Sequence, residues 1–197
     1  GLYNAEKAKA EFAKAKEALQ AQGVNFPIHL DLPVSQSDKA GIQQASSFKQ
    51  SVESALGKDN VVVDLQQMSE DDFNNTGYFA NSAAQKDYDL STSGWTPDYQ
   101  DPSTYLDVFD PTNGGLLQAI GIEPGQNQDV VSALGLNDYK ALNDDANKET
   151  SDTSVRYEKY ANSQAWLTDS GLTLPSISNG ANPLVQKSVP FTRAYSW

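Results

Sequence analysis

Residues 28–34 read Ile-His-Leu-Asp-Leu-Pro-Val, an alternation of apolar side chains with polar ones or proline. This period of two predicts a strand with one buried face, and Pro33 indicates that the strand ends there or lies at a sheet edge. Residues 61–65, Val-Val-Val-Asp-Leu, are rich in β-branched side chains and predict a second strand. A shorter apolar run surrounds Leu90. We therefore expect one sheet that contains strands near residues 27–34, 60–67 and 88–93.

Helical patterns alternate with these strands. Asn4 is a good N-cap, and Gly23 is a good stop for the helix that follows it. Ser37 is expected to open a second helix, which Gly57 closes. The order of helices and strands favours an α/β layer with crossover connections, in which both helices pack on the sheet. Further along the chain, helical spacing predicts two more helices at residues 137–149 and 152–169.

The composition excludes several classes of site. Fourteen basic residues face 26 acidic ones, and a net charge of −12 opposes non-specific binding to nucleic acid or an anionic membrane. The chain has no cysteine and one histidine, His29, so disulfides, thiolate sites and multi-histidine metal sites are excluded. The acidic run after Ser69 is interpreted as a helix start, not as a metal site. No nucleotide-binding or hydrolase motif is present, so we expect no metal and no cofactor.

The sequence shows no internal repeat and no low-complexity linker, so residues 1–197 are predicted to form one domain. A chain of this length can bury a core without disulfides. It begins with Gly1 and contains no apolar run near the ~20 residues of a membrane span. We expect an excised piece of a longer protein.

The most unusual segment is residues 94–102, Gly-Trp-Thr-Pro-Asp-Tyr-Gln-Asp-Pro. It places two aromatic rings and two carboxylates on a loop, and loops that leave strands often carry ligand sites in α/β folds. Trp95 offers a flat apolar face, and a carboxylate beside it can hold a cationic group such as a free α-amino group. The structural alternative is a buried Trp95 that anchors the loop, with Asp101 capping the next helix.

Asp98 and Asp101 also admit an enzymatic interpretation. Paired carboxylates hydrolyse glycosides when a suitable distance separates them, so a carbohydrate-active enzyme is an alternative function. A calcium loop that begins at Asp98 is excluded, because its sixth position is Ser103 and not glycine, and its twelfth is Phe109 and not glutamate.

The motif Gly-Trp-x-x-Asp-Tyr-x-Asp-Pro at residues 94–102 resembles the signature of the family 5 extracellular solute-binding proteins, the peptide-binding components of ABC importers. The opening residues 3–9, Tyr-Asn-Ala-Glu-Lys-Ala-Lys, look like the family's first helix, with Ala5 in place of proline. Residues 157–175 resemble its late helix and the strand after it. The likeness covers essentially the whole chain, and within the family it is nearest to the oligopeptide-binding lipoproteins of streptococci.

This resemblance implies a fold and a role. The chain is then an α/β lobe of a type II periplasmic-binding-protein-like fold, with a central sheet flanked by helices. It corresponds to the C-terminal lobe of a two-lobed receptor that closes on a peptide. The implied partners are an oligopeptide ligand, the N-terminal lobe and the importer's permease subunits. The implied receptor is a monomer without enzymatic activity, held by a lipid anchor at the extracellular face of the membrane.

The resemblance also assigns the site. Asp98 is expected to bind the peptide's α-amino group and Trp95 to form the cleft wall, with Gly94, Thr96 and Tyr99 completing the ligand-binding set. Some relatives carry an arginine two residues before this glycine, where the chain has Thr92. A sugar- or nickel-binding relative on the same scaffold is a further alternative.

Overall fold

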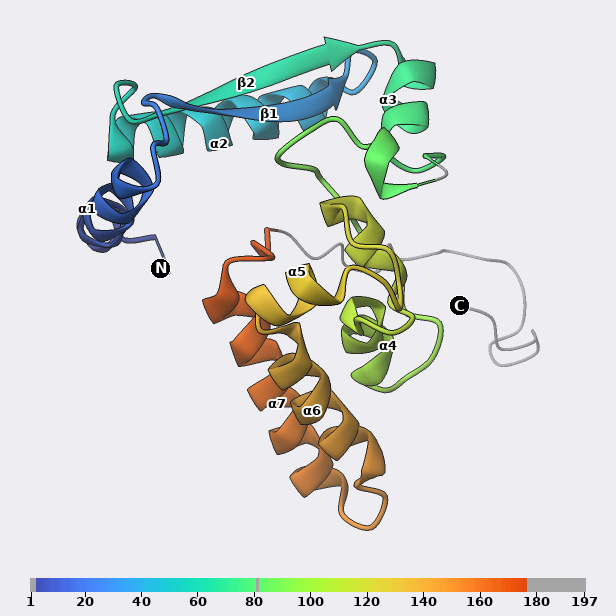
Figure 1. Cartoon of the computed structure of the whole chain (residues 1–197). Coiled ribbons are helices and arrows are strands. Elements are labelled where there is room, and N and C mark those ends of the chain that lie inside the picture. The colour runs from blue at the N-terminus through green and yellow to red at the C-terminus, as the bar shows by residue number, and fades with distance from the viewer. Residues whose placement is uncertain (1–2, 81, 177–197) are drawn as a thin grey trace, which may run out of the picture. The chain divides into compact units, whose positions relative to one another are not determined.

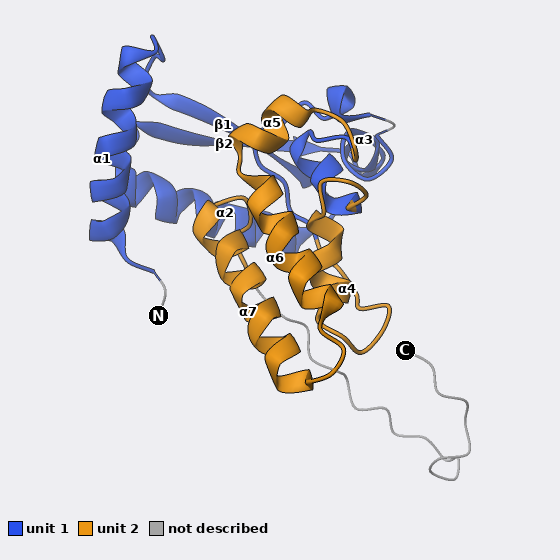
Figure 2. Ribbon diagram, turned by 60° about the horizontal axis from the view of Figure 1, so that its bottom comes forward, with its two compact units in different colours: residues 1–93, 115–123 blue, residues 94–114, 124–197 orange. Residues whose placement is uncertain are grey.

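The computed structural model describes residues 3–80 and 82–176 (Figure 1). The chain divides into two compact units, residues 1–93 with 115–123 and residues 94–114 with 124–197 (Figure 2). Each unit has its own cluster of buried apolar side chains. The interpretation of residues 1–197 as one domain stays a prediction.

A parallel pair of strands forms the centre of the first unit. β1 (Ile28–Ser35) pairs with β2 (Val61–Met68) in a register that places Ile28 opposite Val61. Parallel strands need a crossover, and α2 (Lys39–Leu56) supplies it and covers one face of the sheet (Figure 1). The core between sheet and helix consists of Leu32, Val34, Ala45 and Val63. The two predicted strands and the helix between them are confirmed.

The predicted third strand at 88–93 is wrong. Within the described residues the sheet has two strands, and residues 88–93 form no ladder. The backbone N–H groups of Asp89 and Leu90 both donate to the Asp31 carbonyl, at 3.1 and 3.0 Å. The Asp31 N–H donates in turn to the Asp89 carboxylate at 2.9 Å. A side chain thus takes the place of the carbonyl that a third strand would offer, and the polar residues that follow do not continue the pairing.

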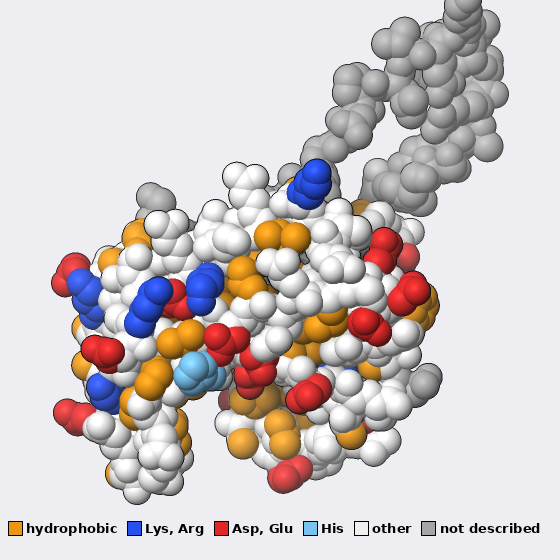
Figure 3. Space-filling model, turned by 90° about the horizontal axis from the view of Figure 1, so that it is seen from above, with side chains coloured by type: hydrophobic (Ala, Val, Ile, Leu, Met, Phe, Trp, Pro, Cys, Tyr) orange, Lys and Arg blue, Asp and Glu red, His pale blue; other side chains and the backbone are white. Residues whose placement is uncertain are grey.

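The opposite face of the sheet is polar. His29 Nδ1 lies 2.6 Å from Asp64 Oδ2, and Gln66 donates to Asp31 at 2.7 Å. Figure 3 shows the histidine beside acidic side chains on the face seen from above. Pro33 lies on a sheet edge, as predicted, but β1 continues beyond it to Ser35.

The other helices of this unit begin at local caps. α1 (Ala5–Ala21) begins after Asn4, whose side chain accepts the Lys7 N–H at 2.9 Å. It packs against α2, not chiefly on the sheet, and Phe12 contacts Phe26 edge-on ahead of β1. α3 (Glu70–Thr76) begins after Ser69, so the acidic run is a helix start, as predicted. Short 3₁₀ helices lie at Ala83–Gln85 and Gly115–Ile120.

The predicted start of α2 needs a small correction. Its N-cap is Asp38 and not Ser37, because the Asp38 carboxylate accepts the Gly41 N–H at 2.9 Å. The Ser37 hydroxyl instead bonds with Ser35 at 2.8 Å and donates to Glu70 at 3.2 Å. Gly57 ends the helix as predicted, at a positive φ of 85°.

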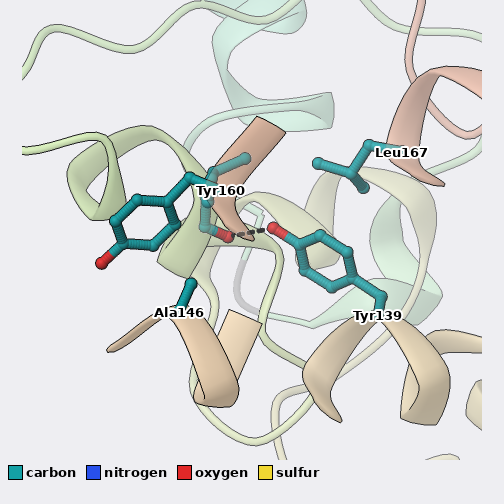
Figure 4. Close-up of a cluster of buried hydrophobic side chains, with 5 residues drawn as sticks. Tyr139, Ala146, Tyr160 and Leu167 are labelled. Atoms are coloured by element: carbon teal, nitrogen blue, oxygen red, sulfur yellow. Dashed lines mark hydrogen bonds between the residues drawn. The ribbon is translucent and has the colours of Figure 1, made fainter. Parts of the chain in front are cut away.

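The second unit is helical. It contains α4 (Ser103–Leu106), a 3₁₀ turn at Asp107–Phe109, α5 (Gln128–Ala133), α6 (Leu136–Lys148) and α7 (Thr153–Ser170). α6 and α7 confirm the two predicted late helices, and the Asp152 side chain caps α7. Leu106, Tyr139, Ala146, Tyr160 and Leu167 form the buried cluster of Figure 4.

The strand that the resemblance implied after the late helix is not present in the described residues, which follow α7 without regular structure as far as residue 176. Leu174 is 73% exposed there. A strand needs a neighbour for its backbone hydrogen bonds, and no described segment pairs with these residues.

Candidate functional site

The loop of residues 94–102 precedes α4 and is held by the first residues of that helix. The Asp98 N–H donates to Thr104 Oγ1 at 3.0 Å, and the Tyr99 hydroxyl bonds with Ser103 Oγ at 3.1 Å. Ser103 and Thr104 are buried. Because buried hydroxyls keep a partner, these bonds fix the middle of the loop to the helical unit.

The predicted site residues lie at the surface of this loop. Gly94, Thr96 and Asp98 are exposed, and Trp95 and Tyr99 expose 42% and 45% of their area. A Cβ on Gly94 would meet open space, so sterics do not demand glycine at this position. Trp95 is therefore not the buried anchor of the structural alternative.

Asp98 presents its side chain while its backbone is tied down. Its N–H is bonded to Thr104, whereas its carboxylate has no hydrogen-bond or ion-pair partner among the residues that the structure describes. An exposed carboxylate on a fixed backbone is able to accept a charge-assisted hydrogen bond from an ammonium group. The assignment of a ligand to Asp98, Trp95, Gly94, Thr96 and Tyr99 stays a prediction.

The Asp101 carboxylate, unlike that of Asp98, is bound by another side chain of the unit. Arg156 of α7 donates to both of its oxygens, from Nε to Oδ2 and from Nη2 to Oδ1, each at 3.0 Å. Oδ1 also accepts the Ser103 N–H at 3.0 Å. The Arg156 hydrogen bond, followed by those from Ser103, holds the pKa of Asp101 well below its usual range in spite of partial burial.

These contacts argue against the glycosidase interpretation. A general acid in glycoside hydrolysis needs a raised pKa, and the pKa of Asp101 is lowered. Both of its oxygens are engaged by Arg156. Asp101 instead holds the start of α4, as the structural alternative expected.

Arg156 is the residue that sequence reasoning missed. Only two arginines occur in the chain, Arg156 and Arg193, against 26 acidic residues. Arginine is the side chain best suited to bind a carboxylate with two parallel hydrogen bonds. The rarity of arginine in this acidic chain therefore marks Arg156 as a candidate for such a pair. Its partner lies 55 positions away, and the sequence does not indicate which carboxylate it chooses.

The described residues contain neither a metal cluster nor a membrane-spanning helix. Within residues 3–80 and 82–176, no group of three or more His, Asp or Glu side chains is arranged to hold a metal ion. In the same residues, no helix is both long enough and apolar enough to cross a membrane.

The chain is similar to streptococcal proteins over nearly its whole length. It is 58% identical over 193 residues to the oligopeptide-binding protein AliB of Streptococcus pneumoniae, covering 98% of this chain and 29% of AliB. It is 52% identical over 198 residues to the oligopeptide-binding protein SarA of Streptococcus gordonii, covering 100% of this chain and 30% of SarA. The chain thus spans less than a third of the length of these relatives.

Solved structures share its fold. A peptide-binding protein of a peptide ABC transporter superposes with a TM-score of 0.58 at 20% identity, over 85% of this chain and 63% of that one. The pheromone receptor PrgZ gives a TM-score of 0.56 at 21% identity, over 85% of this chain and 27% of PrgZ. The predicted fold class, an α/β lobe of a solute-binding fold, is confirmed, and the part of the sheet that the structure describes is smaller than expected.

The family model that describes the middle part of family 5 matches residues 2–115, which include β1, α2, β2 and the loop that carries Trp95 and Asp98. This match spans more than half of the chain. The chain belongs to the bacterial extracellular solute-binding proteins, family 5.

Proposed function

We propose that this chain is the C-terminal lobe of a two-lobed receptor that binds oligopeptides as the substrate-binding component of an ABC importer. The streptococcal relatives AliB and SarA are oligopeptide-binding proteins, and the chain covers about 29% of AliB. The observation that carries the proposal is the exposed carboxylate of Asp98, which has no partner in the part of the chain that the structure describes, on a backbone fixed by Thr104.

In the proposed mode of binding, the receptor recognises the peptide mainly through its backbone and not through its side chains. Hydrogen bonds to an extended peptide backbone tolerate different sequences, which suits a receptor for nutrient peptides. Asp98 binds the α-amino group, and Trp95 forms an apolar wall beside it. Gly94, Thr96 and Tyr99 complete the surface on this side of the ligand.

The receptor is a binding protein without catalytic activity. Its partners are the oligopeptide, the N-terminal lobe of the same receptor and the permease subunits of the importer. It acts as a monomer at the extracellular face of the membrane, to which a lipid outside this chain anchors it.

Calorimetry on the full-length receptor tests this function. We expect heat of binding with oligopeptides and none with free amino acids, monosaccharides or nickel ions. Denaturation of the purified receptor should release co-purified peptides, which mass spectrometry identifies. Binding of a sugar or of nickel with no peptide binding would contradict the proposal.

A further inference from the structure

The Arg156 guanidinium joins two elements of the helical unit. Nε and Nη2 bind the Asp101 carboxylate, while Nη1 donates to the carbonyls of Ala146, Asn147 and Glu149, at 3.0, 3.2 and 3.0 Å. Those carbonyls lie at the C-terminal end of α6 and at its C-cap Glu149, where the backbone acceptors carry partial negative charge. Arg156 therefore offsets the negative charge of a helix end through Nη1 and that of a loop carboxylate through Nε and Nη2.

Rigid packing holds the guanidinium in this position. Its side chain is only 19% exposed. The guanidinium carbon lies 4.8 Å from the centre of the Tyr160 ring, which belongs to the buried cluster of the unit. A stacked guanidinium with so many hydrogen bonds has little freedom to reorient.

A short series of contacts leads from Arg156 to the candidate ligand site. The Asp101 carbonyl accepts the Thr104 N–H at 3.2 Å, and the Thr104 hydroxyl accepts the Asp98 N–H at 3.0 Å. Arg156 thus fixes Asp101, Asp101 fixes the first turn of α4, and that turn fixes the backbone of Asp98.

We infer that Arg156 is a positioning residue for ligand recognition, because it holds the backbone of Asp98 in place through Asp101 and Thr104. This inference rests on the proposed function, in which Asp98 binds the peptide's α-amino group. Recognition of an ammonium by one carboxylate depends on the placement of that carboxylate, because a hydrogen bond weakens steeply away from its preferred distance and angle.

The same pair of helices offers a matched control. Lys159 of α7 forms an ion pair with Asp145 of α6 at 2.9 Å, three residues beyond Arg156. This pair also joins α6 to α7, but among the described residues neither side chain forms a hydrogen bond or ion pair with the loop of residues 94–102. Lys159→Gln therefore removes an interhelical charge pair without touching the path to Asp98.

The experiment compares variants of the full-length receptor with a free peptide and its N-acetylated form. In Arg156→Gln we expect affinity for the free peptide to fall about tenfold or more, and the preference for the free over the acetylated peptide to shrink. Arg156→Lys should not restore it, because one ammonium cannot replace the fork. Lys159→Gln should keep both affinity and preference.

Hydrogen exchange supplies a second measurement, which needs no ligand. Amides of residues 94–104 should exchange faster in Arg156→Gln and in Thr104→Val than in Lys159→Gln. Thr104→Val leaves the Arg156–Asp101 pair intact, so it tests the path even if Arg156→Gln fails to fold. A wild-type receptor that binds no oligopeptide would overturn the proposed function, and hydrogen exchange would then decide whether Arg156 holds the loop.

Two results would overturn the inference itself. One is a folded Arg156→Gln receptor with an unchanged preference for the free peptide. The other is equal effects of Arg156→Gln and Lys159→Gln on affinity and on exchange of the loop, which would make Arg156 a general stabiliser of the helix pair.

Discussion

Glu53 of α2 accepts the backbone N–H of Val63 at 3.1 Å, on the edge of β2 that faces away from β1. Lys49, one turn earlier on α2, donates to the Val63 carbonyl and to Glu53. Two side chains of the crossover helix therefore satisfy both backbone groups at the middle of a sheet edge. Unpaired edges invite strand addition from other chains, and this ion pair blocks it at Val63.

Replacing the acceptor should uncover that edge. Glu53→Ala leaves a buried N–H and the charge of Lys49 without their partner, and we expect a loss of about 1–3 kcal/mol of stability. Urea denaturation measures it. Lys58→Gln is the control, because Lys58 lies 3.5 Å from the same carboxylate with a side chain that is 74% exposed, and its loss should cost little. Equal losses of stability in both variants would contradict the role of Glu53 as the acceptor for the Val63 N–H.

The Tyr139 hydroxyl forms a buried hydrogen bond in the helical unit. It donates to the Leu106 carbonyl at 2.6 Å, inside the cluster of Figure 4, and burial raises the pKa of Tyr139. Tyr139→Phe should lower the free energy of unfolding by about 1–2 kcal/mol, since a buried hydrogen bond is lost. Tyr157→Phe, at a half-exposed ring on α7, should change it little. An unaltered thermal midpoint in Tyr139→Phe would contradict this account.

The Arg156–Asp101 pair should give stability a definite dependence on pH. The folded-state pKa of Asp101 lies below its unfolded value, so its contribution is present above the unfolded pKa of about 3.9 and is lost as pH falls toward the folded value. Asp101→Asn should therefore cost about 2–3 kcal/mol at pH 7 and progressively less below about pH 4. Chemical denaturation at pH 7 and pH 3 measures the difference. A cost that stays constant with pH would contradict the ion pair.

Local features of the fold were predictable from the sequence because their causes are local. Asn4, Ser69 and Asp152 each cap a helix by accepting an N–H two or three residues ahead, so a short window contains the whole interaction. The strands at 28–35 and 61–68 follow from the period and the β-branched residues of each segment.

The features that the sequence did not predict correctly depend on partners that lie far away along the chain. The segment at 88–93 has strand-like residues, but the Asp89 side chain competes for the backbone of Asp31, which lies 58 positions away. The sequence does not decide whether Trp95 is exposed, because a tryptophan on a loop suits a buried anchor as well as a ligand wall. The role of Asp101 depends on Arg156, which binds its carboxylate from 55 positions away.

Asp98 provides the sharpest test of the proposed site. In the full-length receptor, Asp98→Ala should weaken binding of a free peptide by about 2–5 kcal/mol, because the ammonium is left buried without its partner. N-acetylation of the peptide removes the same charge, so it should weaken wild-type binding strongly and barely affect the variant further. Tyr105→Ala, at an exposed ring on α4, is the control and should keep the full effect of acetylation. Calorimetry of the four combinations of receptor and peptide gives the coupling energy. A coupling energy near zero, together with a lowered thermal midpoint in Asp98→Ala, would make Asp98 a residue that only shapes the loop, and the α-amino group would need another partner.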